Sequence, residues 1–504
     1  MDKILIKNVK LLDGVNYFGE PHSLIVCGGE IAEICDEPLL SENNFSKIID
    51  GENCFLTPTF VDVHSHSDIS VLSPFELASK KLSGFGAEIV GNCGLSCFPV
   101  SCKNIDNLKK IYKKYPIEIN WKTFADYQKI VRQNLTKTEI YSLVGHNTLH
   151  SAVAAYENRV VTVDEIKLMQ NLLAQSLEAG ALGLSLGLLY SPGRFAEPQE
   201  VIELFKTVAE YEKIVCVHLK SEGDYLLESL MEMLDFSRQA NLHNLHISHL
   251  KTGGEANFYK IDSLMEIIEK APQTHGVYVT FDRYPFCQSL TQLSVAGPEK
   301  FLSVPDSRIM EILQNSDIEC QNFLDYLKRK EETYFNKITL VATELVDYKK
   351  FAGENLVNIA LKTNQSVENL ILTLVKYDSI NALAAFESMS EVNMRRIISH
   401  PLCMLGSDET ARPLDFSLGS SHVRNFGAVS EFIKILCQLD CDKSFIIKKL
   451  SSLPCQRFSL HRLGELKKKY KAKFNLIDFD KIKTNADFAN PHQVSDGVKI
   501  LHFE

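Results

Sequence analysis

The chain has 504 residues, a net charge of −10 and a pI near 5.9, which argue against a nucleic acid or an acidic membrane surface as its partner. It is 45% hydrophobic and 23% charged, as globular proteins are, and no apolar run is long enough to span a bilayer. Its 13 cysteines include no CxxC pair, and the N-terminus alternates like a strand instead of resembling a signal peptide. These features favour reduced thiols and a cytoplasmic location.

The two ends of the chain have the same character. Residues 1–57 are predicted to form short strands separated by turns, in KILIKNVKLL, HSLIVCGGEIAEIC and KIIDGENCFLTP. Residues 464–504 return to this pattern in AKFNLIDFDKI and GVKILHFE. We therefore expect one small β-sandwich domain built from both termini.

The middle of the chain, residues 58–463, alternates between apolar runs and helical patterns. The clearest helix is predicted over 163–179, where Thr162 and Glu165 form a capping box and an apolar stripe follows. Eight strand-like runs favour a (β/α)8 barrel of the TIM type over a doubly wound sheet, because the count matches closure. The long gap before the last run predicts an insertion at about 290–398. The runs are FVDVHSH, GAEIVGNCG, IYSLVGHN, ALGLSLGL, KIVCVHLKSEG, LHNLHISHLK, GVYVTFDRYP and LCMLGSDE.

Reactive side chains stand at the ends of these runs. Active sites of such barrels lie at the carboxyl ends of the strands. Imidazole, thiolate and carboxylate groups gathered there suit zinc, and they could bind one ion or two. The residues are His64, His66, Cys93, His146, Tyr190, His218, His249, Asp282 and Asp408.

Motifs along nearly the whole chain carry a family resemblance. The chain resembles the amidohydrolase superfamily and, within it, the N-acyl-D-amino-acid deacylases, or D-aminoacylases. GNCG is the most specific motif, because it resembles the deacylases, in which a cysteine bridges metals where many relatives use a carboxylated lysine. The motifs, in the family's order, are FVDVHSHSD, GNCGLSCFP, LVGHNTL, GALGLSLGLLYSP, VHLKSEGD, ISHLK, DRYPF, LGSDE, SHVRNFGAVSEF and SSLPCQRFSL.

The resemblance implies a metal centre. It implies a tightly held zinc on Cys93, His218 and His249. A second, weaker metal position would involve His64 and His66 and would share Cys93.

The resemblance also implies catalytic and substrate-binding residues. Asp408 matches the catalytic aspartate after the last strand. Lys251 matches a substrate-contacting lysine, and Arg424 matches an arginine that holds the substrate carboxylate. Tyr190 and Ser289 match further substrate contacts.

Three positions leave alternatives open. His246 precedes His249 by three residues, and a different reading of the strand would exchange them; same-face parity and the SHxK match favour His249. His146 fits its motif, but its role stays open. Glu409 follows Asp408 where the family usually has a small residue, a departure on the substrate side of the site.

The resulting hypothesis is zinc-dependent hydrolysis of N-acyl-D-amino acids to a carboxylate and a D-amino acid. Zinc lowers the pKa of its water from about 15.7 to near 7, and Asp408 would act as general base and then acid. The nearest alternative is a cyclic-amide hydrolase of the hydantoinase or dihydroorotase kind. A non-catalytic scaffold that has lost its metals is the alternative from another class.

Overall fold

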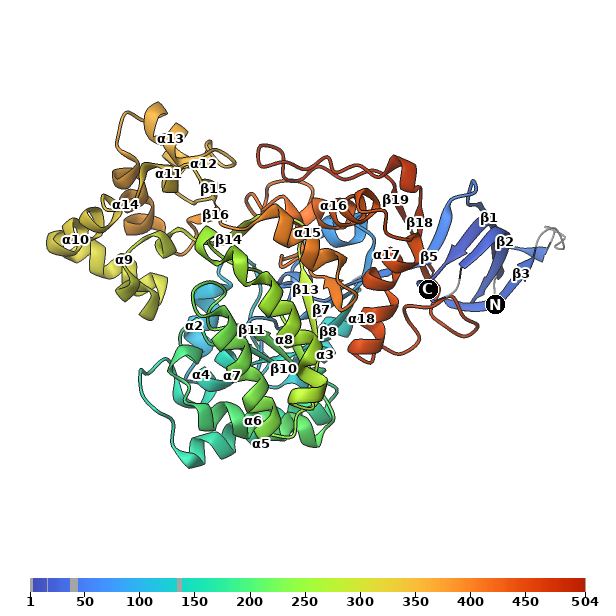
Figure 1. Ribbon diagram of the computed structural model, residues 1–504, viewed down its shortest axis with the longest axis horizontal. Helices are drawn as coiled ribbons and strands as arrows, with labels where there is room; N and C mark the ends of the chain where they lie inside the picture. The colour runs from blue at the N-terminus through green and yellow to red at the C-terminus, as the bar shows by residue number, and fades with distance from the viewer. Residues whose placement is uncertain (1–2, 16, 37–43, 134–137, 504) are drawn as a thin grey trace.

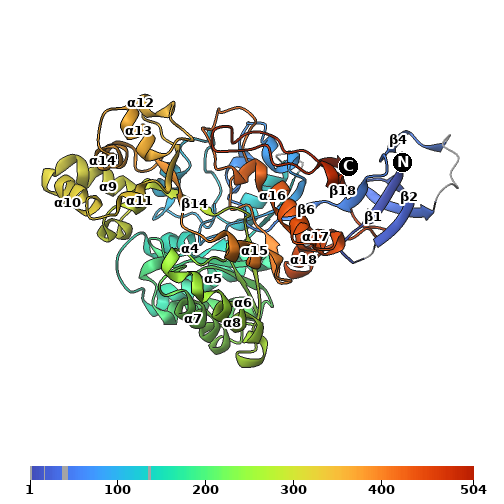
Figure 2. The ribbon, with the colours of Figure 1, turned by 45° about the horizontal axis from the view of Figure 1, so that its top comes forward.

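The computed structural model describes residues 3–15, 17–36, 44–133 and 138–503. Figure 1 shows a central α/β body with a sheet at one end and a mainly helical lobe at the other. In the rotated view of Figure 2, the lobe and the sheet again lie on opposite sides of the central body.

Parallel strands at eight positions form a closed barrel in the central body. The hydrogen-bonded order runs β6-β7-β8 and β9-β10-β11-β12-β13-β17, and β8 continues into β9 after Leu143. The ring closes where Val63 N donates to Leu405 O at 3.4 Å and Ser65 pairs with Glu409 in a parallel bridge. The predicted (β/α)8 barrel is therefore confirmed. Its strands are β6 Phe60–Asp62, β7 Phe85–Val90, β8 Glu139–Ser142, β9 Val144–Gly145, β10 Gly183–Gly187, β11 Ile214–His218, β12 Asn244–Ile247, β13 Tyr278–Arg283 and β17 Cys403–Leu405.

Helices cover the outside of the barrel. The predicted capping box is present at the start of α5, where Thr162 and Glu165 exchange side-chain and backbone hydrogen bonds. The helices of this layer are α1 Ala78–Leu82, α2 Ile105–Ile111, α3 Phe124–Gln133, α4 His146–Ala154, α5 Val163–Glu178, α6 Pro198–Glu210, α7 Leu226–Gln239, α8 Ile261–Thr274, α15 Glu391–Ser399, α16 Arg424–Gln438, α17 Lys443–Leu450 and α18 Ser452–Arg457.

Strand alternation aims functional side chains into the barrel. In β11, Val215 and Val217 belong to the apolar cluster shared with the surrounding helices, while Ile214 and Cys216 belong to a separate cluster with residues of other barrel strands. His218 continues the second set, because residues i and i+2 of a strand share a face. The strand therefore directs His218 to the mouth of the barrel.

Strands from both ends of the chain share one seven-stranded sheet. β1 pairs with β2 on one edge and with β4 and β5 in parallel, and β5 pairs with β18. Buried apolar residues of these strands form their own cluster. The strands are β1 Lys3–Leu12, β2 Tyr17–Cys27, β3 Glu30–Asp36, β4 Lys47–Asp50, β5 Phe55–Pro58, β18 Lys473–Ile477 and β19 Val498–His502.

The segment between β13 and α15 forms the lobe. A three-stranded antiparallel sheet, in the order β14-β16-β15, packs with helices around its own apolar cluster. Its elements are β14 Gln288–Gln292, α9 Asp306–Asn315, α10 Asp317–Leu327, α11 Glu332–Phe335, β15 Ile338–Ala342, α12 Val346–Lys349, α13 Leu356–Lys362, α14 Val367–Asp378 and β16 Leu383–Glu387.

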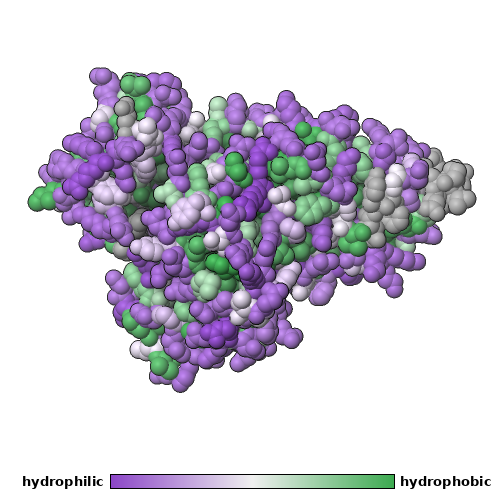
Figure 3. All heavy atoms as spheres, viewed as in Figure 1, coloured by the Kyte–Doolittle hydropathy of each residue, from purple (hydrophilic) through white to green (hydrophobic). Residues whose placement is uncertain are grey.

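The surface is mainly polar. Figure 3 shows hydrophilic side chains over most of one face, with hydrophobic residues scattered among them. Within the part of the chain that the structure describes, no helix combines the length and the apolar character that a membrane crossing requires.

Candidate metal centre

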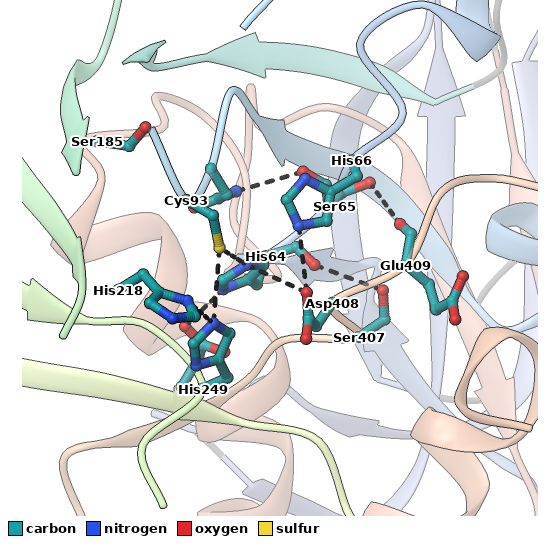
Figure 4. Close-up of polar contacts among 12 residues, drawn as sticks. His64, Ser65, His66, Cys93, Ser185, His218, His249, Ser407, Asp408 and Glu409 are labelled. Carbon is teal, nitrogen blue, oxygen red and sulfur yellow. Dashed lines mark hydrogen bonds and ion pairs between the residues drawn. The ribbon is translucent and has the colours of Figure 1, made fainter. Parts of the chain in front are cut away.

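Four strand ends of the barrel bring their histidines and a cysteine together (Figure 4). Cys93 Sγ lies 3.2 Å from His64 Nε2 and 3.5 Å from His249 Nε2. His218 Nδ1 lies 2.7 Å from His249 Nε2. Asp408 Oδ1 lies 3.5 Å from His64 Nε2, which places a carboxylate beside the same group. We call these five residues the barrel cluster.

Two donor-atom distances in the barrel cluster fit a zinc ion, whereas the 2.7 Å between His218 Nδ1 and His249 Nε2 is shorter than two ligands of one zinc ion require. Zinc bonds of 2.0–2.3 Å in a tetrahedron separate neighbouring ligand atoms by roughly 3.3–3.8 Å. The distances from Cys93 Sγ to the nitrogens of His64 and His249 are close to this value. Four of the side chains are also buried, so that their lone pairs face one another instead of water: His64, Cys93, His218 and His249. A soft thiolate with imidazoles is the ligand set that zinc prefers.

Electrostatics keeps the cysteine in its ligand form. Burial alone would raise the pKa of Cys93, but the neighbouring imidazoles of His64 and His249 lower it well below its ordinary value. The thiolate is the form that binds metals. Cys93 is therefore prepared to bind a cation, unlike Cys97, whose pKa burial raises.

Three residues of the cluster have left-handed backbones. The φ angles are 53° for Cys93, 37° for His249 and 52° for Asp408. Such angles are uncommon outside glycine, and they concentrate at functional sites. At Cys93 the turn also needs Gly94, because a Cβ there would come within 2.5 Å of Asn147 Oδ1.

The backbone of His249 corrects one sequence argument. Strand β12 ends at Ile247, and within it His246 points into the barrel, where its Nε2 bonds Asp282 Oδ2 at 3.0 Å. The alternation of the strand therefore directs His246, and not His249, into the barrel, so the alternation argument for His249 was wrong. His249 reaches the cluster through its left-handed φ after the strand has ended.

Carboxylates behind the cluster orient its histidines. Asp282 Oδ2 lies 3.2 Å from His64 Nδ1, and Glu222 Oε1 lies 2.9 Å from His249 Nδ1. Such contacts fix the tautomer and turn the other ring nitrogen toward a metal. Glu222 is not among the residues predicted from the sequence, although it stands four residues after His218 in VHLKSEGD.

The candidate catalytic aspartate sits between a histidine and an arginine. Asp408 Oδ1 lies 3.1 Å from His66 Nε2, and Asp408 Oδ2 lies 3.0 Å from Arg424 Nη1. Burial would raise the pKa of Asp408, but the charges of Arg424 and His64 lower it well below its usual range. The side chains of Asp408 and His66 are 15% and 27% exposed, so this side of the cluster is accessible to solvent.

Of the remaining predicted site residues, two lie beside the barrel cluster and one does not. Lys251 ion-pairs with Glu222 beside the cluster, and the ring of Tyr190 lies 5.1 Å from that of His218. Ser289, by contrast, lies in β14 opposite Phe386, within the sheet of the lobe. The structure thus brings Lys251 and Tyr190 to the barrel cluster and places Ser289 in a different sheet.

The chain is similar to known proteins over nearly its whole length. No family model matches the chain. It is 25% identical over 497 residues to an N-acyl-D-aspartate deacylase of Alcaligenes xylosoxydans xylosoxydans, covering 98% of this chain and 89% of that protein. A D-aminoacylase of the same organism is 24% identical over 518 residues, covering 99% of this chain and 93% of that protein.

Solved structures show the same fold. An N-acyl-D-glutamate deacylase from Bordetella bronchiseptica, complexed with zinc and a phosphonate mimic of the tetrahedral intermediate, superposes with a TM-score of 0.81. It is 24% identical and covers 100% of this chain and 95% of its own. A D-aminoacylase described as having a binuclear metal centre gives a TM-score of 0.78 at 24% identity, covering 98% of this chain and 94% of its own.

Proposed function

Because the chain is a full-length relative of the N-acyl-D-amino-acid deacylases, we propose that it hydrolyses the amide bond of N-acyl-D-amino acids. The observation that carries the proposal is the sulfur of Cys93 among imidazoles at the mouth of a barrel, with the partly exposed Asp408 beside it. Cys93, His218 and His249 would hold the tightly bound zinc. His64 and His66, with Cys93 shared, would form the weaker position.

Zinc in this centre would supply Lewis acidity, which lowers the pKa of water and polarises a carbonyl group. Asp408 would take a proton at its carboxylate and later give it to the departing amine nitrogen, because an amine leaves poorly unless it is protonated. Its partial exposure supports this role, since water and substrate can reach its oxygens. His66, bonded to the same carboxylate, would hold it in position.

Two cations would bind the carboxylate of the substrate. Arg424 stacks over the ring of Tyr284 at 4.3 Å, which orients the guanidinium toward Asp408. Its planar fork can bind a carboxylate through two hydrogen bonds. The second cation is Lys251, whose Nζ lies 2.9 Å from His249 Nδ1. The substrate carboxylate would share these cations with Asp408 and Glu222.

The cysteine distinguishes this proposal from a cyclic-amide hydrolase. Cyclic-amide hydrolases typically bridge their metals with a carboxylated lysine. The buried Lys80 is committed elsewhere, because its Nζ bonds Asp62 Oδ2 at 2.6 Å and Ser407 Oγ at 2.6 Å. Cys93 Sγ lies within 3.5 Å of ring nitrogens of both His64 and His249, which supports the cysteine as the bridging ligand.

Two further features belong to the proposal. Residues 1–57 and 464–504 would form the small β-domain and residues 58–463 the catalytic domain, with the insertion at about 290–398; the shared sheet of β1 and β18 supports this division. The protein would act in the cytoplasm, where its 13 cysteines, among which the sequence has no CxxC pair, would stay reduced.

Paired substrates test the proposed function directly. Zinc-loaded protein would be given N-acetyl-D- and N-acetyl-L-amino acids with acidic, apolar and aromatic side chains, and a chelator-treated sample would serve as control. We expect release of D-amino acids only, abolished by the chelator. Release from neither series by protein with zinc bound would contradict the proposal, and a cyclic amide would be the next substrate to assay.

A further inference from the structure

A second group of metal-ligating side chains lies outside the barrel cluster, between two helices. His146 and His150 stand on α4, and Glu200 stands on α6; all three are buried. His146 Nε2 and His150 Nδ1 each lie 2.8 Å from Glu200 Oε1. Spacing of four residues puts both rings on one face of α4. We call these three residues the helix cluster.

The proton positions of His146 follow from its neighbour Asn147. The Nδ2 atom of Asn147 donates to Gly187 O at 3.2 Å and to Tyr190 O at 3.4 Å, so its Oδ1 faces His146. His146 Nδ1 lies 3.4 Å from this oxygen. Because an amide oxygen only accepts hydrogen bonds, this contact suits an N–H at Nδ1 and leaves Nε2 facing Glu200.

Two ring nitrogens of the helix cluster, His146 Nε2 and His150 Nδ1, converge on one carboxylate oxygen, Glu200 Oε1, at 2.8 Å each. These distances are hydrogen-bond lengths and are shorter than the roughly 3.3–3.8 Å between zinc ligands, so a bound ion would move the three donor atoms apart by about half an ångström. Glu200 Oε2 and His150 Nε2 are also buried without a hydrogen-bond partner among the described residues. A carboxylate with an unused buried oxygen can bind a metal through both oxygens.

We propose that His146, His150 and Glu200 bind a structural zinc ion. Two imidazoles and a carboxylate are zinc ligands, and the second oxygen of Glu200 or a water would complete four-fold coordination. Metal-bound histidines commonly donate their other ring N–H to an oxygen, as His146 does to Asn147. The ligands are fully buried and offer no open side for a substrate, so the ion would be structural.

The ion would join α4 to α6, with α5 packed against both helices. Its consequence reaches the barrel mouth through Asn147. By fixing His146, the ion would also fix the neighbouring Asn147, whose side chain donates to the carbonyl groups of Gly187 and Tyr190. Tyr190 lies against the ring of His218 in the barrel cluster. The helix cluster would therefore hold one wall of the active site without touching the substrate.

Zinc content per chain, measured by mass spectrometry on purified full-length protein, tests the proposal. The variants are His150→Gln, Cys93→Ala and the double variant, with the exposed His243→Gln as control. We expect His150→Gln to remove one zinc ion per chain in both backgrounds, and His243→Gln to remove none. Unchanged zinc in His150→Gln would overturn the proposal. The loss in Cys93→Ala reports the barrel cluster, so the two sites succeed or fail separately.

A measurement on the unaltered chain covers the case in which His150→Gln does not fold. Anomalous difference maps from crystals, recorded on both sides of the zinc absorption edge, locate each ion directly. We expect one peak between His146, His150 and Glu200 in addition to density at Cys93. Density at Cys93 alone would show that a proton, and not a metal ion, separates His146 from Glu200.

Discussion

The barrel cluster and the helix cluster use the same kinds of ligand in opposite surroundings. The barrel cluster draws its side chains from separate strand ends, and Cys93, His249 and Asp408 have left-handed backbones. The helix cluster draws them from regular turns of α4 and α6, and its side chains are closed off from solvent. Asp408, at 15% exposure, marks the side from which the barrel cluster can be reached. Left-handed backbone angles and solvent access thus occur together at the barrel cluster, where catalysis is proposed. The helix cluster, with its regular helices and buried side chains, suits a structural role.

The largest effect should come from the accessible carboxylate. In Asp408→Asn the side chain keeps its size and can still bond Arg424, but it can no longer accept the proton. Loss of a general acid–base group costs about 10²–10⁴-fold in rate. We expect kcat/KM to fall by this factor while the zinc content stays at the wild-type value. Activity near that of the wild type would contradict the assigned role of Asp408.

A smaller effect should follow at the arginine that faces the same carboxylate. Hydrogen bonds to charged groups contribute about 1.5–3 kcal/mol, which corresponds to roughly 10–150-fold in binding. We expect Arg424→Met to raise KM for N-acyl-D-amino acids within this range. Arg424→Lys is the matched control, because it keeps the charge but loses the planar fork.

The substrate offers its own control for Arg424. An N-acyl amine that lacks the carboxylate should be hydrolysed slowly by the wild type, and Arg424→Met should change its rate far less. An equal loss on both substrates would mean that Arg424 acts through Asp408, to which it is bonded, and not on the substrate.

A third test concerns the positioning residue Asp282, which joins His64 to His246. Removing such an outer contact typically costs about 10–100-fold in metal affinity or activity. We expect Asp282→Asn to weaken zinc binding by this factor at the barrel cluster, measured by competition with a chelator. The helix cluster has no contact with Asp282 and should keep its zinc. Loss of zinc from both clusters would indicate misfolding, and a variant with wild-type affinity would contradict the positioning role.

The sequence predicts the barrel and the metal ligands because both leave local signals. Each strand is an apolar run, and each ligand stands within four residues of the end of its strand, as His218 ends β11 and His249 follows β12 by two residues. Glu200 and Glu222 leave no such signal, because their roles depend on which elements the fold brings beside them. Ser289 illustrates the same limit from the other direction. The resemblance matches Ser289 to a substrate contact, but the strand of Ser289 pairs within the sheet of the lobe.

The smallest effect should appear at α5, the helix between the two that carry the helix cluster. Side-chain hydrogen bonds from Arg159, then the bond from Thr162 N, lower the pKa of Glu165 to about 2. The ordinary value is 4.5, so this stabilisation is complete above pH 4.5 and is lost as the pH falls toward 2. Replacing the cap in Thr162→Ala should cost about 1 kcal/mol. Hydrogen exchange of the first-turn amides of α5 measures both effects.

The cap also tests what holds the helix cluster together. If a zinc ion joins α4 to α6, Thr162→Ala should speed exchange at the start of α5 and leave exchange at His150 unchanged. The zinc content should stay constant, because the cap touches no ligand. If hydrogen bonds alone held His146, His150 and Glu200, loosening α5 should also loosen α4 and α6, and hydrogen exchange at His150 should rise as well. Glu165→Gln should reproduce the effect at pH 6, and its effect should shrink as the pH falls from 4.5 toward 2, where the wild-type carboxylate becomes protonated.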